Sequence, residues 1–219
     1  MPDGKAALAG HTELWLNCAM RIILFCLLFA LPAAAQDATA LVAAARAQVG
    51  VTTIYDPSYQ SLTFPGGDVD PAHGVCTDVI IRALRKAWDV DLQLAVNRDM
   101  KTHFSAYPKQ WDLKSTDRNI DHRRVANLQT LFTRIGASLP ISTDAANYQP
   151  GDVVTWLLPG NLPHIGIVSD TRSADGTRLQ VLHNIGAGAQ EEDRLFDFSV
   201  TGQYRLNPEA VAKLITLGR

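Results

Sequence analysis

The first half of the chain repeats its apolar residues at the spacing of helices. Apolar positions recur every three or four residues, and glycines follow two of the stretches. Between the first two stretches, proline, glycine and aspartate interrupt the pattern over residues 51–73, which predicts a long loop. The pattern predicts four helices, at residues 38–49, from about 74 to 88, from about 97 to 107, and at 124–135.

The second half changes to a period of two, which is typical of strands. Asp175-Gly176 separates two of these segments and indicates a hairpin. A final apolar stretch, residues 207–217, predicts a terminal helix. Helices followed by antiparallel strands indicate an α+β fold, not the alternation of a parallel sheet. The predicted strands are residues 152–158, 164–170, 179–184 and 194–198.

The N-terminal segment has the features of a signal peptide. Arg21 precedes ten apolar residues (22–31), which are too few to span a bilayer because about 20 are needed. Ala33 and Ala35 fit the small-residue requirement of a signal peptidase. We expect a signal peptide at residues 1–35 cut after Ala35, with Met20 a possible true start. The mature chain would be periplasmic or secreted, without a stable membrane anchor.

Composition limits the remaining possibilities. The chain has 219 residues, 47% of them hydrophobic, which suits one domain at residues 36–219. Its formal net charge is -2, so no general basic field would attract nucleic acid or anionic lipid. Partners must be recognised by local chemistry, and the sequence leaves the oligomeric state open.

Cys76 is the cysteine that the predicted mature chain keeps, since Cys18 and Cys26 precede the cleavage site. A lone thiol cannot form an internal disulfide, so it is either buried and inert or kept for its reactivity. Cys76 opens the second predicted helix, directly after Gly74-Val75. Free N–H groups and the helix dipole stabilise a thiolate there, which predicts a pKa below the usual ~8.5.

Two histidines on predicted strands could serve this thiol. His164 follows a proline turn, and Gly166 shares its strand face, which would leave room for the helix that carries Cys76. His183 lies on an apolar face of the next strand and could orient His164. Asn184 points to the opposite face and is the weaker candidate for that role.

Several motifs together resemble the NlpC-type, papain-like cell-wall cysteine peptidases and their amidase relatives. The resemblance covers roughly residues 40–206 and is greatest to a branch of secreted bacterial proteins catalogued as a domain of unknown function. It implies a papain-like fold with N-terminal helices packed on a C-terminal antiparallel sheet. The motifs are Gly74-Val75-Cys76-Thr77-Asp78, Asn119-Ile120-Asp121-His122-Arg123-Arg124, Pro150-Gly151-Asp152, His164-Ile165-Gly166-Ile167-Val168-Ser169-Asp170 and His183-Asn184-Ile185-Gly186.

The resemblance also implies roles for individual residues. Cys76 would be the nucleophile, His164 the general base and acid, and His183 the group that fixes the tautomer of His164. The substrate would be an amide bond in peptidoglycan peptides, and no metal or cofactor is required. An upstream tyrosine would help to bind the oxyanion, and both Tyr55 and Tyr59 are candidates.

Other polar residues are candidates for oxyanion or substrate binding: Asp78, His122, Arg123, Arg124 and Asn184. Arg123 or Arg124 could bind a substrate carboxylate through paired hydrogen bonds. A charged segment of this kind is more often a solvated surface, so both readings stay open.

Three rival functions fit the same residues. The domain could be a catalytically silent module that binds wall peptides or a protein. Cys76, His164 and His183 could instead form a zinc site with one open position. The enzyme could also transfer the acyl group to an acceptor other than water.

Overall fold

The computed structural model describes residues 37–219, which belong to one compact unit, Gln36–Arg219. The expected signal peptide and the cut after Ala35 lie outside the described residues. None of the helices in the described part has the length and apolar character needed to span a bilayer.

Within residues 37–219 there are five α-helices, and four of them lie close to the predicted positions. Asp37 caps the first helix by accepting a hydrogen bond from the Thr39 N–H at 2.8 Å. Short 3-10 turns lie at Phe104–Ala106, Asp121–Arg123 and Ala145–Asn147. The helices are α2 (Ala38–Arg46), α3 (Cys76–Trp88), α4 (Leu92–Thr102), α5 (Val125–Arg134) and α6 (Pro208–Gly218).

Helix α4 begins five residues earlier than the predicted stretch of residues 97–107. Asp91 caps it, since its side chain accepts a hydrogen bond from the Gln93 N–H at 2.9 Å. Leu92, Val96 and Met100 are buried at a spacing of four residues and form the apolar stripe. The cap aspartate and the earlier leucine therefore decide where the helix starts.

The sheet has six strands in the order β3-β8-β4-β5-β6-β7, and every pairing is antiparallel. A separate parallel pair joins β1 (Ile54–Tyr55) to β2 (His73–Gly74) within the predicted long loop. The α+β prediction is confirmed. The strands of the sheet are β3 (Ser138–Leu139), β4 (Val153–Leu158), β5 (Leu162–Arg172), β6 (Leu179–Asn184), β7 (Ala189–Glu192) and β8 (Ser199–Tyr204).

The predicted strand at residues 194–198 is wrong. The segment forms turns, with the Asp197 N–H donating to the carbonyl of Arg194. Leu195 is fully buried there, and its carbonyl accepts a hydrogen bond from the Trp156 indole N–H at 2.9 Å. Leu195 therefore fills the core from a turn, while β7 and β8 form on either side.

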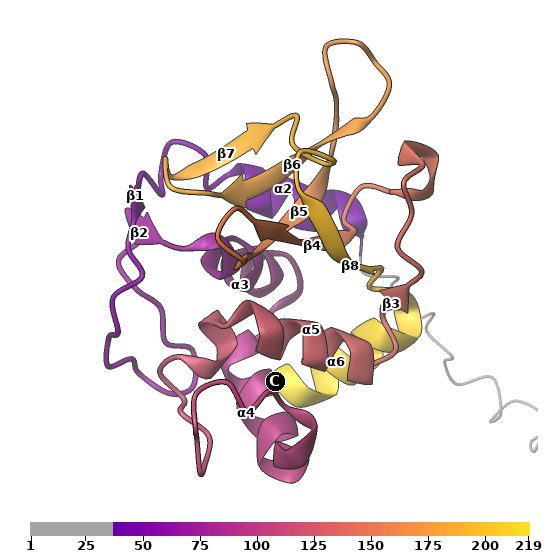
Figure 1. The fold of residues 1–219 in the computed structure, drawn as a ribbon. Coiled ribbons are helices and arrows are strands. Elements are labelled where there is room, and N and C mark those ends of the chain that lie inside the picture. The colour runs from indigo at the N-terminus through magenta and orange to yellow at the C-terminus, as the bar shows by residue number, and fades with distance from the viewer. Residues whose placement is uncertain (1–36) are drawn as a thin grey trace, which may run out of the picture. The chain divides into compact units, whose positions relative to one another are not determined.

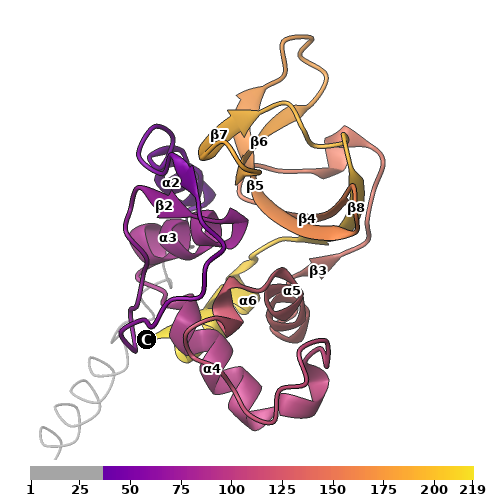
Figure 2. The same ribbon diagram turned by 60° about the vertical axis from the view of Figure 1, so that its left-hand side comes forward.

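The helices cover one face of the sheet. Helices α2 and α3 pack on β5 and β6, and α5 packs on β5 and β8. In Figure 1 the strands lie above α4, α5 and α6, and Figure 2 shows how strongly the sheet curves beside α2 and α3. Strand β5 contributes to both sides, since Ile165 and Ile167 pack with the helices whereas Val168 packs in the cluster on the other face.

Candidate functional site

Cys76 is the first residue of α3 and lines a pocket. The thiol residue is 5% exposed and belongs to the cluster between helices and sheet. The pocket has a volume of about 230 Å³. Its lining comes from five separate segments of the chain: Tyr55, Pro57, Val75, Cys76, Gln110, Trp111, Ile120, Arg123, Val125, Ala126 and Pro163.

A buried ion pair fixes the start of α3. The Asp78 carboxylate accepts a hydrogen bond from the Val75 N–H at 2.7 Å, which satisfies a free donor at the helix end. Arg123 donates two hydrogen bonds, of 3.0 and 2.9 Å, to the same carboxylate. The side chains of Asp78 and Arg123 are at most 3% exposed. Asp78 and Arg123 therefore hold the helix start, and the Arg123 guanidinium is already engaged by a carboxylate of the protein.

Two more contacts tie neighbouring segments to the helix start. Arg123 also donates to the carbonyls of Asp56 and Ser58, at 3.2 and 3.4 Å, beside Tyr55. From the sheet, the buried Asn184 amide donates to the Gly74 carbonyl at 3.1 Å. Asn184 is thus a positioning contact between β6 and the segment that precedes Cys76.

The thiol has a raised pKa, opposite to the expectation from its place at a helix start. Burial raises the pKa of Cys76 to about 12, and the negative charge of Asp78 adds to the rise. The backbone N–H groups of Ile165, Thr77 and Cys76 act in the other direction. Burial outweighs the helix start, so the resting thiol is protonated at neutral pH.

The structure brings His164 and His183 together and adds a third residue. His164 Nε2 lies 2.8 Å from His183 Nδ1, and His183 Nε2 lies 3.0 Å from a carboxylate oxygen of Glu192. Both histidines are at most 2% exposed. Since His164 Nε2 is engaged, Nδ1 is the ring nitrogen that is left for another partner.

Glu192 was not a candidate from the sequence. Glu192 lies on β7 and pairs with Val181 of β6. His183 comes two residues after Val181 on β6, so Glu192 and His183 point to the same face of the sheet. Residues 189–192 follow a glycine-containing turn and were not predicted as a strand. Residues 189–192 have the sequence Ala-Gln-Glu-Glu, in which apolar and polar residues do not alternate, so the period of two gave no signal for this strand.

Both histidines are neutral in the resting site. Burial lowers the pKa of His164 to about 3, with a smaller contribution from His183. Burial also lowers the pKa of His183, and the hydrogen bond to Glu192 opposes that shift. The arrangement is therefore a neutral imidazole pair with a carboxylate at its outer end.

Gly166 makes room for a different neighbour than the sequence suggested. A Cβ at this position would lie 3.0 Å from His183 Cβ and 3.2 Å from the Trp156 ring, and α3 is not among its nearest neighbours. The glycine therefore admits the histidines and the indole, whereas the helix packs on the Ile165 face. Cys76 packs in the same cluster as Ile165, and the Ile165 backbone N–H, one residue from His164, lowers the pKa of its thiol.

The two candidate tyrosines have separate places. Tyr55 lines the Cys76 pocket, and burial together with the nearby Cys76 and Asp78 raises the pKa of Tyr55 to about 12, so its hydroxyl remains a donor. Tyr59 is 60% exposed, and its hydroxyl bonds to Asp117 and Asn119 outside that pocket. Tyr55 is the tyrosine positioned beside the thiol.

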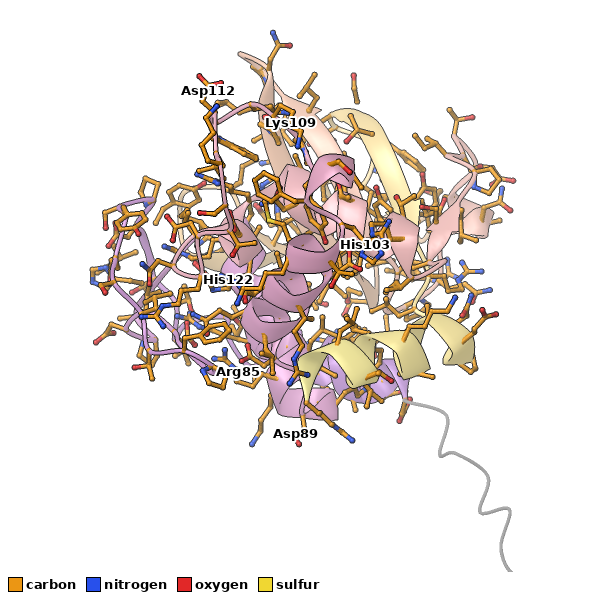
Figure 3. The ribbon with its side chains drawn as sticks, turned by 90° about the horizontal axis from the view of Figure 1, so that it is seen from below. Arg85, Asp89, His103, Lys109, Asp112 and His122 are labelled. Carbon is orange, nitrogen blue, oxygen red and sulfur yellow. The ribbon has the colours of Figure 1, made fainter. Side chains whose placement is uncertain are left out.

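His122 and Arg124 do not line the Cys76 pocket. Burial lowers the pKa of His122 to about 4, and the charge of Arg85 contributes to the shift. Figure 3 labels both residues. Within residues 37–219, the buried Nδ1 of His122 has no hydrogen-bond partner. Arg124 binds Asp121 at 3.0 Å and stacks 4.1 Å from the centre of the Trp111 ring. Arg124 therefore supports the wall of the pocket through Trp111.

The histidine pair does not have the geometry of a zinc site. Two nitrogens on one tetrahedral zinc at about 2.0–2.1 Å lie roughly 3.3 Å apart. The facing nitrogens of His164 and His183 are 2.8 Å apart, a hydrogen-bond distance. In residues 37–219, no group of three or more His, Cys, Asp or Glu side chains is placed to hold a metal ion.

Comparisons with known proteins place the chain in a family. Residues 42–206 match the family described as a domain of unknown function, DUF1287. An uncharacterized protein of Escherichia coli K12, YijF, is 55% identical over 161 residues, which are 74% of this chain and 78% of that protein. The match includes the segments that carry Cys76, His164 and His183, and the chain belongs to the DUF1287 family.

Proposed function

We propose that this protein is an exported cysteine hydrolase of amide bonds with a papain-like, NlpC-type fold. The observation that carries the proposal is the hydrogen-bonded series His164–His183–Glu192, together with the Ile165 backbone N–H, next to His164 in the chain, which acts on the Cys76 thiol at a helix start. A cysteine nucleophile needs a base, and the base needs a third group that orients it. We further propose a peptidoglycan amidase or endopeptidase acting in the periplasm or outside the cell.

The reaction would be acyl transfer to water. As the Cys76 sulfur attacks the amide carbonyl, Nδ1 of His164 takes the thiol proton, and the carbonyl electrons move onto oxygen. The C–N bond then breaks, and His164 returns the proton to the leaving amine. Water, deprotonated by His164, hydrolyses the thioester and restores the thiol.

The oxyanion would bind two donors at the pocket wall. These are the Cys76 backbone N–H at the start of α3 and the Tyr55 hydroxyl, which stays protonated. A donor of this kind contributes on the order of 3 kcal/mol to the transition state in other enzymes.

The resting pKa values favour proton transfer during the attack and not before it. Cys76 is protonated and His164 neutral, so no thiolate–imidazolium pair stands ready. His183 would stabilise the cation that forms on His164, and Glu192 would stabilise His183 in turn. His183 and Glu192 would therefore stabilise the protonated form of His164, which is otherwise a weak base.

The test is digestion of purified peptidoglycan, with released peptides identified by mass. We expect products from the wild type and none from Cys76→Ala or His164→Ala, while Lys109→Gln, a change outside the site, digests normally. Equal product profiles for wild type and Cys76→Ala would remove the hydrolase proposal.

A catalytically silent binding module is the second candidate, because the thiol is buried and its pKa is raised. Sedimentation of the protein with insoluble peptidoglycan distinguishes the two. Wild type and Cys76→Ala that co-sediment equally, with no peptide released by either, would support the module.

A further inference from the structure

A second, larger pocket lies beside the Cys76 pocket and is rich in cations. Its volume is about 550 Å³. Lys101 at the end of α4, Lys114 and Arg118 contribute positive charges, and all three are exposed. We call it the cationic groove; its lining is Tyr59, Phe64, Asn97, Lys101, Leu113, Lys114, Ser115, Thr116, Asp117, Arg118 and Asn119.

Among residues 37–219, the three cations of the groove have no carboxylate partners. Within residues 37–219, none of them forms an ion pair, and Arg118 instead rests 5.8 Å from the centre of the Phe64 ring. Other arginines are engaged; Arg178, for example, binds Asp193 at 2.7 Å. In a chain of net charge -2, three uncommitted cations around one groove make a local positive site.

The groove adjoins the Cys76 pocket. Asn119 lines the groove, and the next residue, Ile120, lines the pocket. Likewise, Tyr59 lines the groove and Pro57 lines the pocket. The Asn119 amide donates to the Tyr59 hydroxyl at 2.8 Å, which joins the two segments that form the boundary. A ligand that fills the pocket and continues past this boundary would enter the groove.

We propose that the cationic groove binds a carboxylate of a peptide substrate whose scissile amide lies at Cys76. The inference rests on the proposed function and adds the substrate class, an acidic peptide. Lys101, Lys114 and Arg118 would supply the charge, and they would lower KM without taking part in the chemical step.

The remaining lining favours a peptide over a polyphosphate. Asp117 places a negative charge among the cations, which would repel a ligand with phosphates at every position. Ser115 and Thr116 offer neutral hydrogen-bonding groups that suit peptide amides, and the buried Asn97 amide holds the Thr116 hydroxyl at 3.2 Å. A ligand with one or two carboxylates and several amides satisfies both features.

The experiment measures binding to Cys76→Ala protein, so it does not depend on cleavage. The probes are the acetylated peptide Ala-Glu-Ala as the free acid, and acetylated Ala-Gln-Ala with an amidated C-terminus, each titrated by NMR. Lys101→Gln/Lys114→Gln/Arg118→Gln is the test variant. Lys109→Gln is the control, because this lysine follows the same helix and bonds to the Phe104 carbonyl outside the groove (Figure 3).

We expect the triple variant to weaken binding of the acidic peptide about threefold to tenfold, as for exposed ion pairs. The control should bind as the parent does, and the amidated peptide should bind weakly to all proteins. Equal affinity for the two peptides, or an unchanged triple variant, would overturn the proposal. So would binding to vesicles of anionic phospholipid with no binding of the acidic peptide. A failed digestion of peptidoglycan with a positive binding result would reject the hydrolase and keep the groove.

Discussion

Two consecutive residues of β6 show how single positions divide the work of the site. His183 faces the side of the sheet with His164 and Glu192, whereas Asn184 faces the helices and holds the Gly74 carbonyl. Alternation along the strand makes this division unavoidable. Sequence reasoning selected His183 over Asn184 by this rule, and the hydrogen bonds agree with it.

Glu192 gives a prediction at the residue scale. Glu192→Gln removes the charge that raises the pKa of His183, so the imidazolium form of the pair becomes less stable. We expect kcat to fall about tenfold with little change in KM, and the acid limb of the pH–rate profile to move to lower pH. Steady-state kinetics across pH checks both effects.

The neighbouring residue provides the control. Glu191 points to the other face and binds Arg46 at 2.8 Å, so Glu191→Gln should alter stability but leave the acid limb in place. A pH profile that moves equally in both variants would refute a specific role for Glu192.

At the scale of elements, the start of α3 depends on a buried ion pair more than on helix propensity. Asp78 satisfies the Val75 N–H, and Arg123 balances the charge while tying down the loop that carries Tyr55. Arg123 was a candidate for binding a substrate carboxylate, but it binds the Asp78 carboxylate of its own chain. Removing one partner leaves a buried charge without compensation.

Arg123→Met is the corresponding prediction. We expect the free energy of unfolding to fall by about 3–5 kcal/mol, because the Asp78 carboxylate stays buried. Adding Asp78→Asn in the same chain should restore part of the loss. Urea denaturation measures both, with Arg124→Gln, at a more exposed ion pair, expected to cost about 1 kcal/mol or less. Additive losses in the double variant would contradict this account.

At the scale of the whole molecule, buried neutral histidines make the fold sensitive to acid. Burial lowers the pKa of His122 to about 4 and that of His164 to about 3, from 6.5 in the unfolded chain. The unfolded state therefore binds more protons as the pH falls. The stability that these groups contribute is complete above about pH 6.5 and is lost as the pH falls towards their folded pKa values.

We predict that the free energy of unfolding decreases steadily from pH 7 to pH 4. The His122 share is on the order of 3 kcal/mol, and His122→Leu should remove that share of the pH dependence. His103→Gln, at a more exposed histidine, is the control. Denaturant titrations at several pH values test this, and equal pH slopes for wild type and His122→Leu would refute it.

The sequence predicted much of the fold and part of the site. Apolar period and caps gave α2, α3, α5, α6 and strands β4 to β6, because these elements bury one continuous stripe or face. The start of α4 and the turn at residues 194–198 were missed. The cap residue Asp91 sets the start of α4. At residues 194–198, Leu195 fills the core from a turn without pairing with a neighbouring strand.

The sequence by itself determined the α+β class, the place of Cys76 at a helix start and the two histidines on neighbouring strands, since local spacing specifies these. Only the tertiary structure showed that the pKa of Cys76 is raised and that Tyr55, not Tyr59, lines its pocket. It also showed that Arg123 pairs with Asp78 and that Glu192 lies beside His183. Burial and strand neighbours set these properties, and both depend on segments far apart in the chain.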